Sequence, residues 1–213
     1  MAAARLRLAA RYRAAVSSDP PNRRQSALQD APPPSGSPGQ GLAGSTAEFL
    51  SGDWNVVRHI SDHRTGQVGS FRGKASVRPH AAGPPGAAAG SHDTDRDEDP
   101  SRPGRVLAYC EHGELQLGSH RGPASRSLLI RDLADGTADV RFADGREFYR
   151  LDLRSGTCQA VHPCRADEYQ VTVTRLSADS YTETWRVAGP AKDYELATTY
   201  SRAGSDAATG GQG

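Results

Sequence analysis

Few cysteines and no long hydrophobic run are present in this sequence, and both absences exclude classes of protein. Cys110, Cys158 and Cys164 are the only three cysteines. An odd count cannot complete a disulfide framework, which favours a reducing compartment, the cytoplasm. No apolar stretch approaches the roughly 18–20 residues that a membrane-spanning helix needs, and the mean hydropathy is -0.65. We therefore expect a cytoplasmic protein without a membrane partner.

An excess of charge of one sign is also missing. The 26 Lys and Arg residues are balanced by 25 Asp and Glu residues, so the formal net charge is +1 at pH 7. A nearly neutral chain lacks the positive field that attracts nucleic-acid phosphates, so we expect no nucleic-acid partner. Lysine is almost absent, since only Lys74 and Lys192 occur. The many arginines are therefore interpreted as a composition bias rather than as functional residues one by one.

Three segments have a composition typical of disorder. Residues 1–47 hold few large apolar residues and a proline run, 79–104 are rich in Gly, Pro and then acids, and 203–213 are small and polar. Such segments bury too little apolar surface to offset the entropy of ordering. Residues 1–16 are also Arg-rich and acid-poor, as organelle transit peptides are, so a targeting segment or an over-extended start are alternatives to a tail. One domain, 48–202, remains around the insertion.

Short runs with a two-residue hydrophobic period make up this domain. Asp135-Gly136 and Asp144-Gly145 each stand between two alternating runs, which strongly indicates a β-hairpin. His112-Gly113 between two further runs also predicts a tight hairpin. Successive hairpins without a long helix predict an all-β fold, an antiparallel up-and-down barrel of about eight to ten strands. Such barrels commonly hold one small ligand, and a β-sandwich is the alternative.

Two of the predicted strands show which residues should point into the barrel. On Glu168–Leu176 and Ser180–Ala188, one alternating face carries the aromatic residues and Glu183. A buried carboxylate must be paired, and Arg58, Arg141, Arg146 and Arg150 are the expected partners. Arginine-rich walls favour a small polar or anionic ligand. The candidate ligand-binding residues are Trp54, Arg58, Arg146, His162, Asp167, Tyr169, Glu183, Trp185 and Lys192.

The segment Cys158–Tyr169 concentrates reactive side chains, and three interpretations of it stay open. Cys158, His162 and Cys164 could bind zinc, Cys164 could act as a nucleophile with His162 as its base, or His162 and Asp167 could contact a ligand near the barrel mouth. No HExxH, GxSxG or phosphate-binding glycine loop is present.

Two functional alternatives to a binding barrel follow from single residues. One is a lyase, isomerase or hydrolase that uses His162 or Glu183 as general base. The other is a haem- or metal-binding barrel with His162 or His59 as axial ligand.

Several matching pieces along the domain resemble one family, domain of unknown function 6314, which is described as lipocalin-like. The pieces are LSGDW at 50–54 with Arg58, GSFRGKA at 69–75, Tyr109 with Glu111 and Gly113, VRFADGREF at 140–148, His162-Pro163-Cys164 with Asp167 and Tyr169, and WRVAGPAKDY at 185–194. The resemblance implies a calycin-type barrel and no assigned activity. This chain departs from the pattern in its 79–104 insertion and in Tyr149, where the family pattern has histidine.

Overall fold

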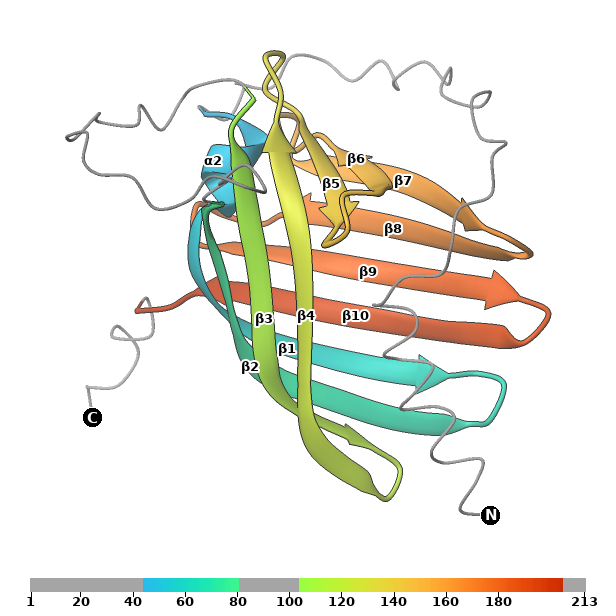
Figure 1. The fold of residues 1–213 in the computed structure, drawn as a ribbon. Coiled ribbons are helices and arrows are strands. Elements are labelled where there is room, and N and C mark those ends of the chain that lie inside the picture. Colours follow the sequence, from blue (N-terminus) through green and yellow to red (C-terminus); the bar gives the residue numbers. More distant parts are fainter. Residues whose placement is uncertain (1–43, 81–103, 205–213) are drawn as a thin grey trace, which may run out of the picture.

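Ten antiparallel strands follow one another in the computed structural model, which describes residues 44–80 and 104–204 (Figure 1). Their order across the single sheet is β6-β5-β4-β3-β2-β1-β10-β9-β8-β7, so all chain neighbours pair except β6 and β7, and β1 also pairs with β10. This confirms the predicted all-β, up-and-down architecture. Residues 1–43, 81–103 and 205–213, which cover most of the expected tails and insertion, lie outside the described residues. The strands are β1 (Gly52–Asp62), β2 (Gln67–Pro79), β3 (Val106–Leu117), β4 (His120–Asp132), β5 (Ala138–Phe142), β6 (Glu147–Leu151), β7 (Thr157–Cys164), β8 (Asp167–Arg175), β9 (Ser180–Gly189) and β10 (Lys192–Arg202).

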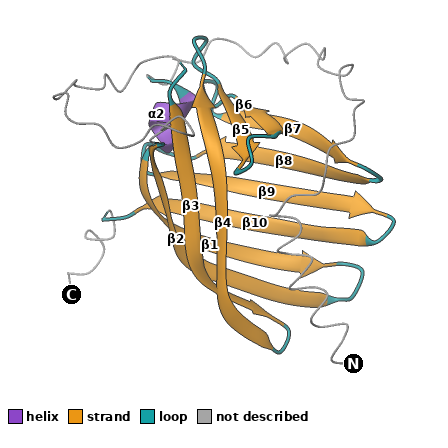
Figure 2. Ribbon diagram, in the orientation of Figure 1, coloured by secondary structure: helices purple, strands orange, loops and turns teal. Residues whose placement is uncertain are grey.

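The sheet curls until its two edge strands, β6 and β7, approach each other and nearly close a barrel (Figure 2). Between them the Cys158 thiol donates a weak hydrogen bond to the carbonyl oxygen of Arg150 across 3.8 Å. Within the described residues no backbone ladder joins these two strands. The barrel therefore has a seam held by side chains, whereas every other neighbouring pair of strands is held by backbone hydrogen bonds.

A single helical turn, α2 (Thr46–Leu50), covers one end of the barrel (Figure 1). Ser45 and Glu48 form a capping box at its start, which satisfies amide groups that a short helix would otherwise leave unpaired. Thr46 ties the turn to the barrel, because its amide donates to the Gly136 carbonyl at 3.0 Å and its hydroxyl accepts from the Leu153 amide at 3.1 Å. The described residues thus include 44–47, which lie before the expected boundary at residue 48. Along the described chain, no helix has the length and hydrophobicity to cross a membrane.

The turns predicted from Asp-Gly pairs are confirmed, whereas the turn predicted at His112-Gly113 is wrong. Gly136 and Gly145 have φ angles of 78° and 86°, which favour glycine, and they join β4 to β5 and β5 to β6. His112 and Gly113 lie inside β3, in register with β2. A Cβ at Gly113 would collide with the Arg72 carbonyl oxygen and lie 2.8 Å from the Phe71 ring. This glycine marks a close approach of two strands rather than a turn.

The predicted inward faces of β8 and β9 are confirmed by their alternating burial. The buried residues are Tyr169, Val171 and Val173 on β8, and Tyr181, Glu183, Trp185 and Val187 on β9. Because side chains alternate across a strand, one face of each strand builds the barrel interior and the other faces outward. That interior contains charged groups as well as hydrocarbon, and these groups define the candidate site.

Candidate functional site

A fully buried ion pair lies at the centre of the interior. Arg58 on β1 and Glu111 on β3 are 1% and 3% exposed, and they form two parallel hydrogen bonds, from Nη1 to Oε1 at 2.8 Å and from Nη2 to Oε2 at 2.7 Å. The Arg58 Nε donates to the Thr198 hydroxyl at 2.8 Å. A planar guanidinium matches a carboxylate in this way, and such geometry is needed to offset the loss of water around two charges.

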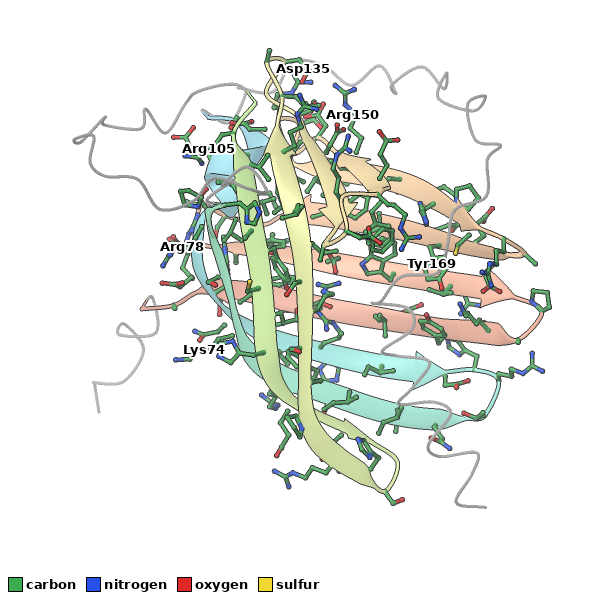
Figure 3. All side chains as sticks on the ribbon, in the orientation of Figure 1. Lys74, Arg78, Arg105, Asp135, Arg150 and Tyr169 are labelled. Atoms are coloured by element: carbon green, nitrogen blue, oxygen red, sulfur yellow. The ribbon has the colours of Figure 1, made fainter. Side chains whose placement is uncertain are left out.

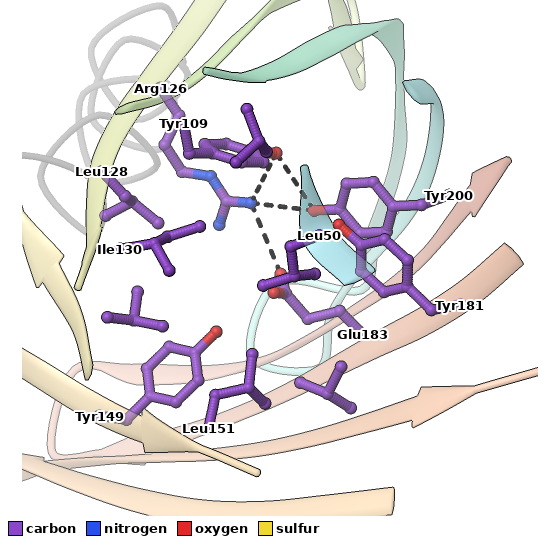
Figure 4. A pocket seen from close by; sticks show the side chains of 13 residues that line it. Leu50, Tyr109, Arg126, Leu128, Ile130, Tyr149, Leu151, Tyr181, Glu183 and Tyr200 are labelled. Carbon is purple, nitrogen blue, oxygen red and sulfur yellow. Dashed lines mark hydrogen bonds and ion pairs between the residues drawn. The ribbon is translucent and has the colours of Figure 1, made fainter. Parts of the chain in front are cut away.

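Arg126 on β4 extends this pair into a larger network, and Figure 4 shows its contacts with Tyr109, Tyr200 and Glu183. Its Nη2 donates to the hydroxyl groups of Tyr200 at 3.0 Å and Tyr109 at 3.2 Å. The same nitrogen lies 3.4 Å from Glu111 Oε2 and 3.5 Å from Glu183 Oε1. The Tyr109 hydroxyl donates to Glu111 at 2.6 Å. Two arginines and two glutamates thus balance each other's formal charge inside the barrel.

The electrostatic environment keeps these groups in defined protonation states. Burial opposes ionisation of Glu111, yet Arg126, Arg58 and the hydrogen bonds from Arg58 and Tyr109 lower its pKa to about 2. Burial, with Glu183 nearby, raises the pKa of Tyr200 to about 12. Burial also raises the pKa of Tyr109 well above its ordinary value. At neutral pH, Glu111 is therefore a carboxylate and both phenols keep their protons.

Protonation of Glu111 at low pH should lower the free energy of unfolding. The pKa of this group falls from 4.5 to about 2 on folding, so its stabilisation is complete above pH 4.5 and is lost as the pH falls toward 2. Integrated over this window, the shift corresponds to about 3 kcal/mol of unfolding free energy. Urea unfolding between these pH values should show a steeper loss for the wild type than for Glu111→Gln. The variant Glu114→Gln, altered at an exposed carboxylate, should retain the wild-type slope; equal slopes in wild type and Glu111→Gln would contradict this role.

A small cavity of about 30 Å³ lies beside the network, space for roughly two water molecules. Two of its lining residues have a buried atom that forms no hydrogen bond with a described residue, Arg126 Nε and Glu183 Oε1, although Oε1 also lies 3.5 Å from Arg126 Nη2. Buried polar atoms need a partner, so a cavity next to two unsatisfied ones indicates a place for water or a ligand. Figure 4 shows the lining residues, which are Leu50, Val77, Tyr109, Arg126, Leu128, Ile130, Val140, Tyr149, Leu151, Val173, Tyr181, Glu183 and Tyr200.

Of the candidates expected from the sequence, Glu183 lines this cavity and the others lie elsewhere. Arg58 belongs to the adjoining ion-pair network. Trp185 lies close by, stacked on Phe148 at 5.0 Å and packed edge-on against the cavity residue Tyr149 at 5.3 Å. Trp54 is fully buried and its indole N–H donates to the Leu50 carbonyl at 2.8 Å, which connects β1 to α2.

A second cluster joins the hairpin β7–β8 to the start of β10. Lys192 Nζ lies 2.8 Å from Asp167 and donates to the Tyr169 hydroxyl at 2.6 Å. Burial opposes its charge, but the hydrogen bonds to Asp167 and Tyr169 raise the pKa of Lys192 above its ordinary value. Three of the candidate residues, Asp167, Tyr169 and Lys192, are thus brought together as a hydrogen-bonded set, and none of them lines the cavity.

His162 and Arg146 lie near that cluster and contact aromatic rings. The His162 ring packs edge-on against Phe148 at 5.1 Å, and burial lowers its pKa below the ordinary value. Arg146 pairs with Asp144 at 2.8 Å and lies over the Phe142 ring. His162 does not line the cavity that Glu183 lines, so the two expected general bases do not share one cavity.

The described residues give no support to a metal or haem centre. Within residues 44–80 and 104–204, no three His, Cys, Asp or Glu side chains gather as a metal site would require. His59 is exposed on the outward face of β1. The three cysteines, Cys110, Cys158 and Cys164, are free thiols.

The residue that pairs with Glu183 was not predicted from the sequence. Arg126 fills this role, and the expected set Arg58, Arg141, Arg146 and Arg150 is wrong. Arg150, for example, pairs with Asp135 at 2.5 Å, and both lie near the end of the barrel covered by α2 (Figure 3). A sequence pattern could have found Arg126, because it alternates with Leu128 and Ile130 on β4 and so shares their inward face.

Together these features define a nearly closed β-barrel with a charge-balanced polar interior and a small internal cavity. The chain belongs to a family of unknown function (DUF6314), whose model matches residues 50–202. The family expected from the sequence pieces is thereby confirmed. A search of curated proteins finds no match.

Three solved structures of other proteins are similar to this chain. The S-type phycobiliprotein lyase CPES from Guillardia theta is 12% identical with a TM-score of 0.53, over 75% of this chain and 91% of that chain. A redesigned β-barrel, mFAP0, bound to DFHBI is 15% identical with a TM-score of 0.35, over 72% and 99% of the two chains. A protein of unknown function from the DUF3598 family of Nostoc punctiforme is 9% identical with a TM-score of 0.36, over 79% and 53%. The first of these similarities shows a shared β-barrel fold.

Proposed function

We propose that this barrel binds a small polar molecule in its internal cavity, with Arg126 and Glu183 as the recognition groups. One observation supports this proposal most directly: Arg126 and Glu183 line the cavity, and their buried atoms Arg126 Nε and Glu183 Oε1 form no hydrogen bond with a described residue. Ligand sites in proteins are typically concave, largely apolar and equipped with a few convergent polar groups. This cavity has that composition on a small scale.

The remaining candidates take supporting positions in this proposal. Arg58 holds Glu111 and so keeps Arg126 in place. Trp185 packs against Tyr149 and sets the position of that cavity wall. Lys192, Asp167, Tyr169, His162 and Arg146 are proposed to form the rim of the barrel mouth, and Trp54 to anchor the opposite, helix-covered end.

The comparisons support this function through the fold. The lyase from Guillardia theta shares the barrel over most of its length, at an identity that carries no residue role across. A location in the cytoplasm is part of the proposal, and the free state of all three cysteines agrees with it.

Native mass spectrometry of the full chain purified from its own host tests this function. The wild type should carry an additional small-molecule mass. Glu183→Leu, which removes the acceptor at the cavity, should lose that mass while keeping the β-sheet circular dichroism spectrum. Glu168→Leu, the same change at an exposed position of β8, should retain it. A wild-type protein without an additional mass, or equal occupancy in both variants, would contradict the proposal.

A further inference from the structure

Arg126 and Glu183 bring a group of hydrogen-bond donors and a group of acceptors close together on the cavity wall. The Arg126 guanidinium reaches within 3.5 Å of Glu183 Oε1 through Nη2, which also donates to Tyr109 and Tyr200. Its Nε and Glu183 Oε1 are buried and form no hydrogen bond with a described residue. Because a guanidinium only donates and a carboxylate only accepts, a ligand that satisfies both must itself offer one acceptor and one donor on the same edge.

The charge balance around this pair selects against ions. Arg58 and Arg126 are matched by Glu111 and Glu183, all within one network. A bound anion would leave the interior with an unmatched negative charge, and a bound cation would leave an unmatched positive one. Burying an unpaired charge is strongly unfavourable, so the network discriminates by charge as well as by hydrogen bonding.

The rest of the wall is formed by seven aliphatic side chains and four tyrosines, and the space is small. A cavity of about 30 Å³ admits a compact group of a few heavy atoms. Such a group would place its polar edge toward Arg126 and Glu183 and a short alkyl part against the aliphatic side chains. The aliphatic lining residues are Leu50, Val77, Leu128, Ile130, Val140, Leu151 and Val173.

We infer that the cavity recognises an uncharged carboxamide group, whose carbonyl oxygen accepts from Arg126 and whose N–H donates to Glu183. This inference rests on the proposed function and specifies the class of ligand for the same site. The arginine content of the sequence suggested an anionic ligand. The structure favours a neutral ligand instead, because the charges of Arg58 and Arg126 are already balanced by Glu111 and Glu183. A carboxylic acid of equal shape lacks the donor and adds the unmatched charge.

Acetamide and acetate form a matched pair of probes for this inference, since they have the same shape and differ in charge and in the donor. The chain contains only two isoleucines, Ile60 and Ile130. Ile130 lines the cavity and Ile60 does not, so methyl-labelled isoleucine gives one reporting signal and one internal control in the same NMR spectrum. Acetamide is only the recognised group and not the whole ligand, so for this probe saturation on the order of millimolar concentration is expected.

The full-length wild type should show a saturable shift of the Ile130 methyl signal with acetamide, at an affinity about tenfold or more above that for acetate. Glu183→Gln keeps the side-chain shape and an acceptor but removes the negative charge, so this variant should reverse the preference toward acetate. Glu168→Gln, changed at an exposed position of β8, should keep the wild-type order. An unmoved Ile60 signal shows that the barrel itself is unchanged.

The possible outcomes distinguish failure of the carboxamide assignment from failure of the proposed ligand-binding function. Tighter binding of acetate than of acetamide by the wild type, or an unchanged order in Glu183→Gln, would overturn the carboxamide assignment and leave a ligand-binding cavity. No movement of the Ile130 signal with either probe, together with a protein that carries no additional mass, would show a cavity filled by water alone and overturn both.

Discussion

Replacing Glu111 by alanine should lower the free energy of unfolding by about 3–5 kcal/mol, because it leaves buried positive charge without its partner. Arg58 would lose both hydrogen bonds to the carboxylate at a position where it is 1% exposed. Arg126 would lose its contact with Glu111 and keep its ion pair with Glu183. Urea denaturation followed by circular dichroism measures this loss, as a fall in midpoint at constant slope.

Two comparisons distinguish a charge effect from loss of packing. The double variant Arg58→Met with Glu111→Leu removes one charge of each sign and fills the space, so it should be clearly more stable than Glu111→Ala. Glu114→Ala, which breaks the exposed pair with Arg121, should leave the midpoint unchanged within error. If Glu111→Ala were no less stable than Glu114→Ala, the buried network would not hold the barrel together.

Replacing Trp54 by alanine should lower the free energy of unfolding by about 3–5 kcal/mol, the usual range for removal of a fully buried large aromatic side chain. Its ring lies 4.9 Å from Tyr181 and 5.8 Å from Phe49, and the Arg202 guanidinium lies over it at 4.0 Å. Removal therefore opens a void where the first strand meets the covering helix. Thermal or urea unfolding of the purified variant measures the loss.

The variant Trp54→Phe distinguishes the contribution of ring packing from that of the indole hydrogen bond. The phenyl ring keeps much of the packing but leaves the Leu50 carbonyl without its donor, so a smaller loss of about 1–3 kcal/mol is expected. Val68→Ala is the control, because Val68 is 72% exposed and a surface change of this kind stays within about 0.5 kcal/mol. A Trp54→Ala variant as stable as Val68→Ala would show that the helix-covered end contributes nothing to stability.

Local patterns were sufficient to predict the strands and their inward faces. The alternation on β8 and β9 correctly identified the buried sides of Tyr169 and Glu183, because side-chain direction in a strand has a strict period of two. The Asp-Gly turns at 135–136 and 144–145 were predicted correctly because their positive φ angles favour glycine. Gly113 misled the same reasoning, since a glycine required by a neighbouring strand looks identical in sequence to one required by a turn.

The candidate site was predicted only in part, and the reason is its composition from distant strands. Glu183 was identified because its own strand shows that it points inward. Its partner Arg126 stands on β4, far away in sequence; the alternation with Leu128 and Ile130 indicates that it points inward, but no local pattern shows which acid it meets. Tyr109 and Glu111, quoted only as pieces of a family pattern, are joined to Arg126 by hydrogen bonds that cross the interior.

By itself the sequence determined the class of fold, the positions of most turns and which face of each strand is buried, since these depend on residues two or three positions apart. Only the tertiary structure decided which charges meet, that the covering turn α2 closes one end, and that the interior is electrically balanced around a small cavity. The physical reason is that curling the sheet brings side chains from β1, β3, β4, β9 and β10 within hydrogen-bond distance, and this depends on the register and curvature of all ten strands together.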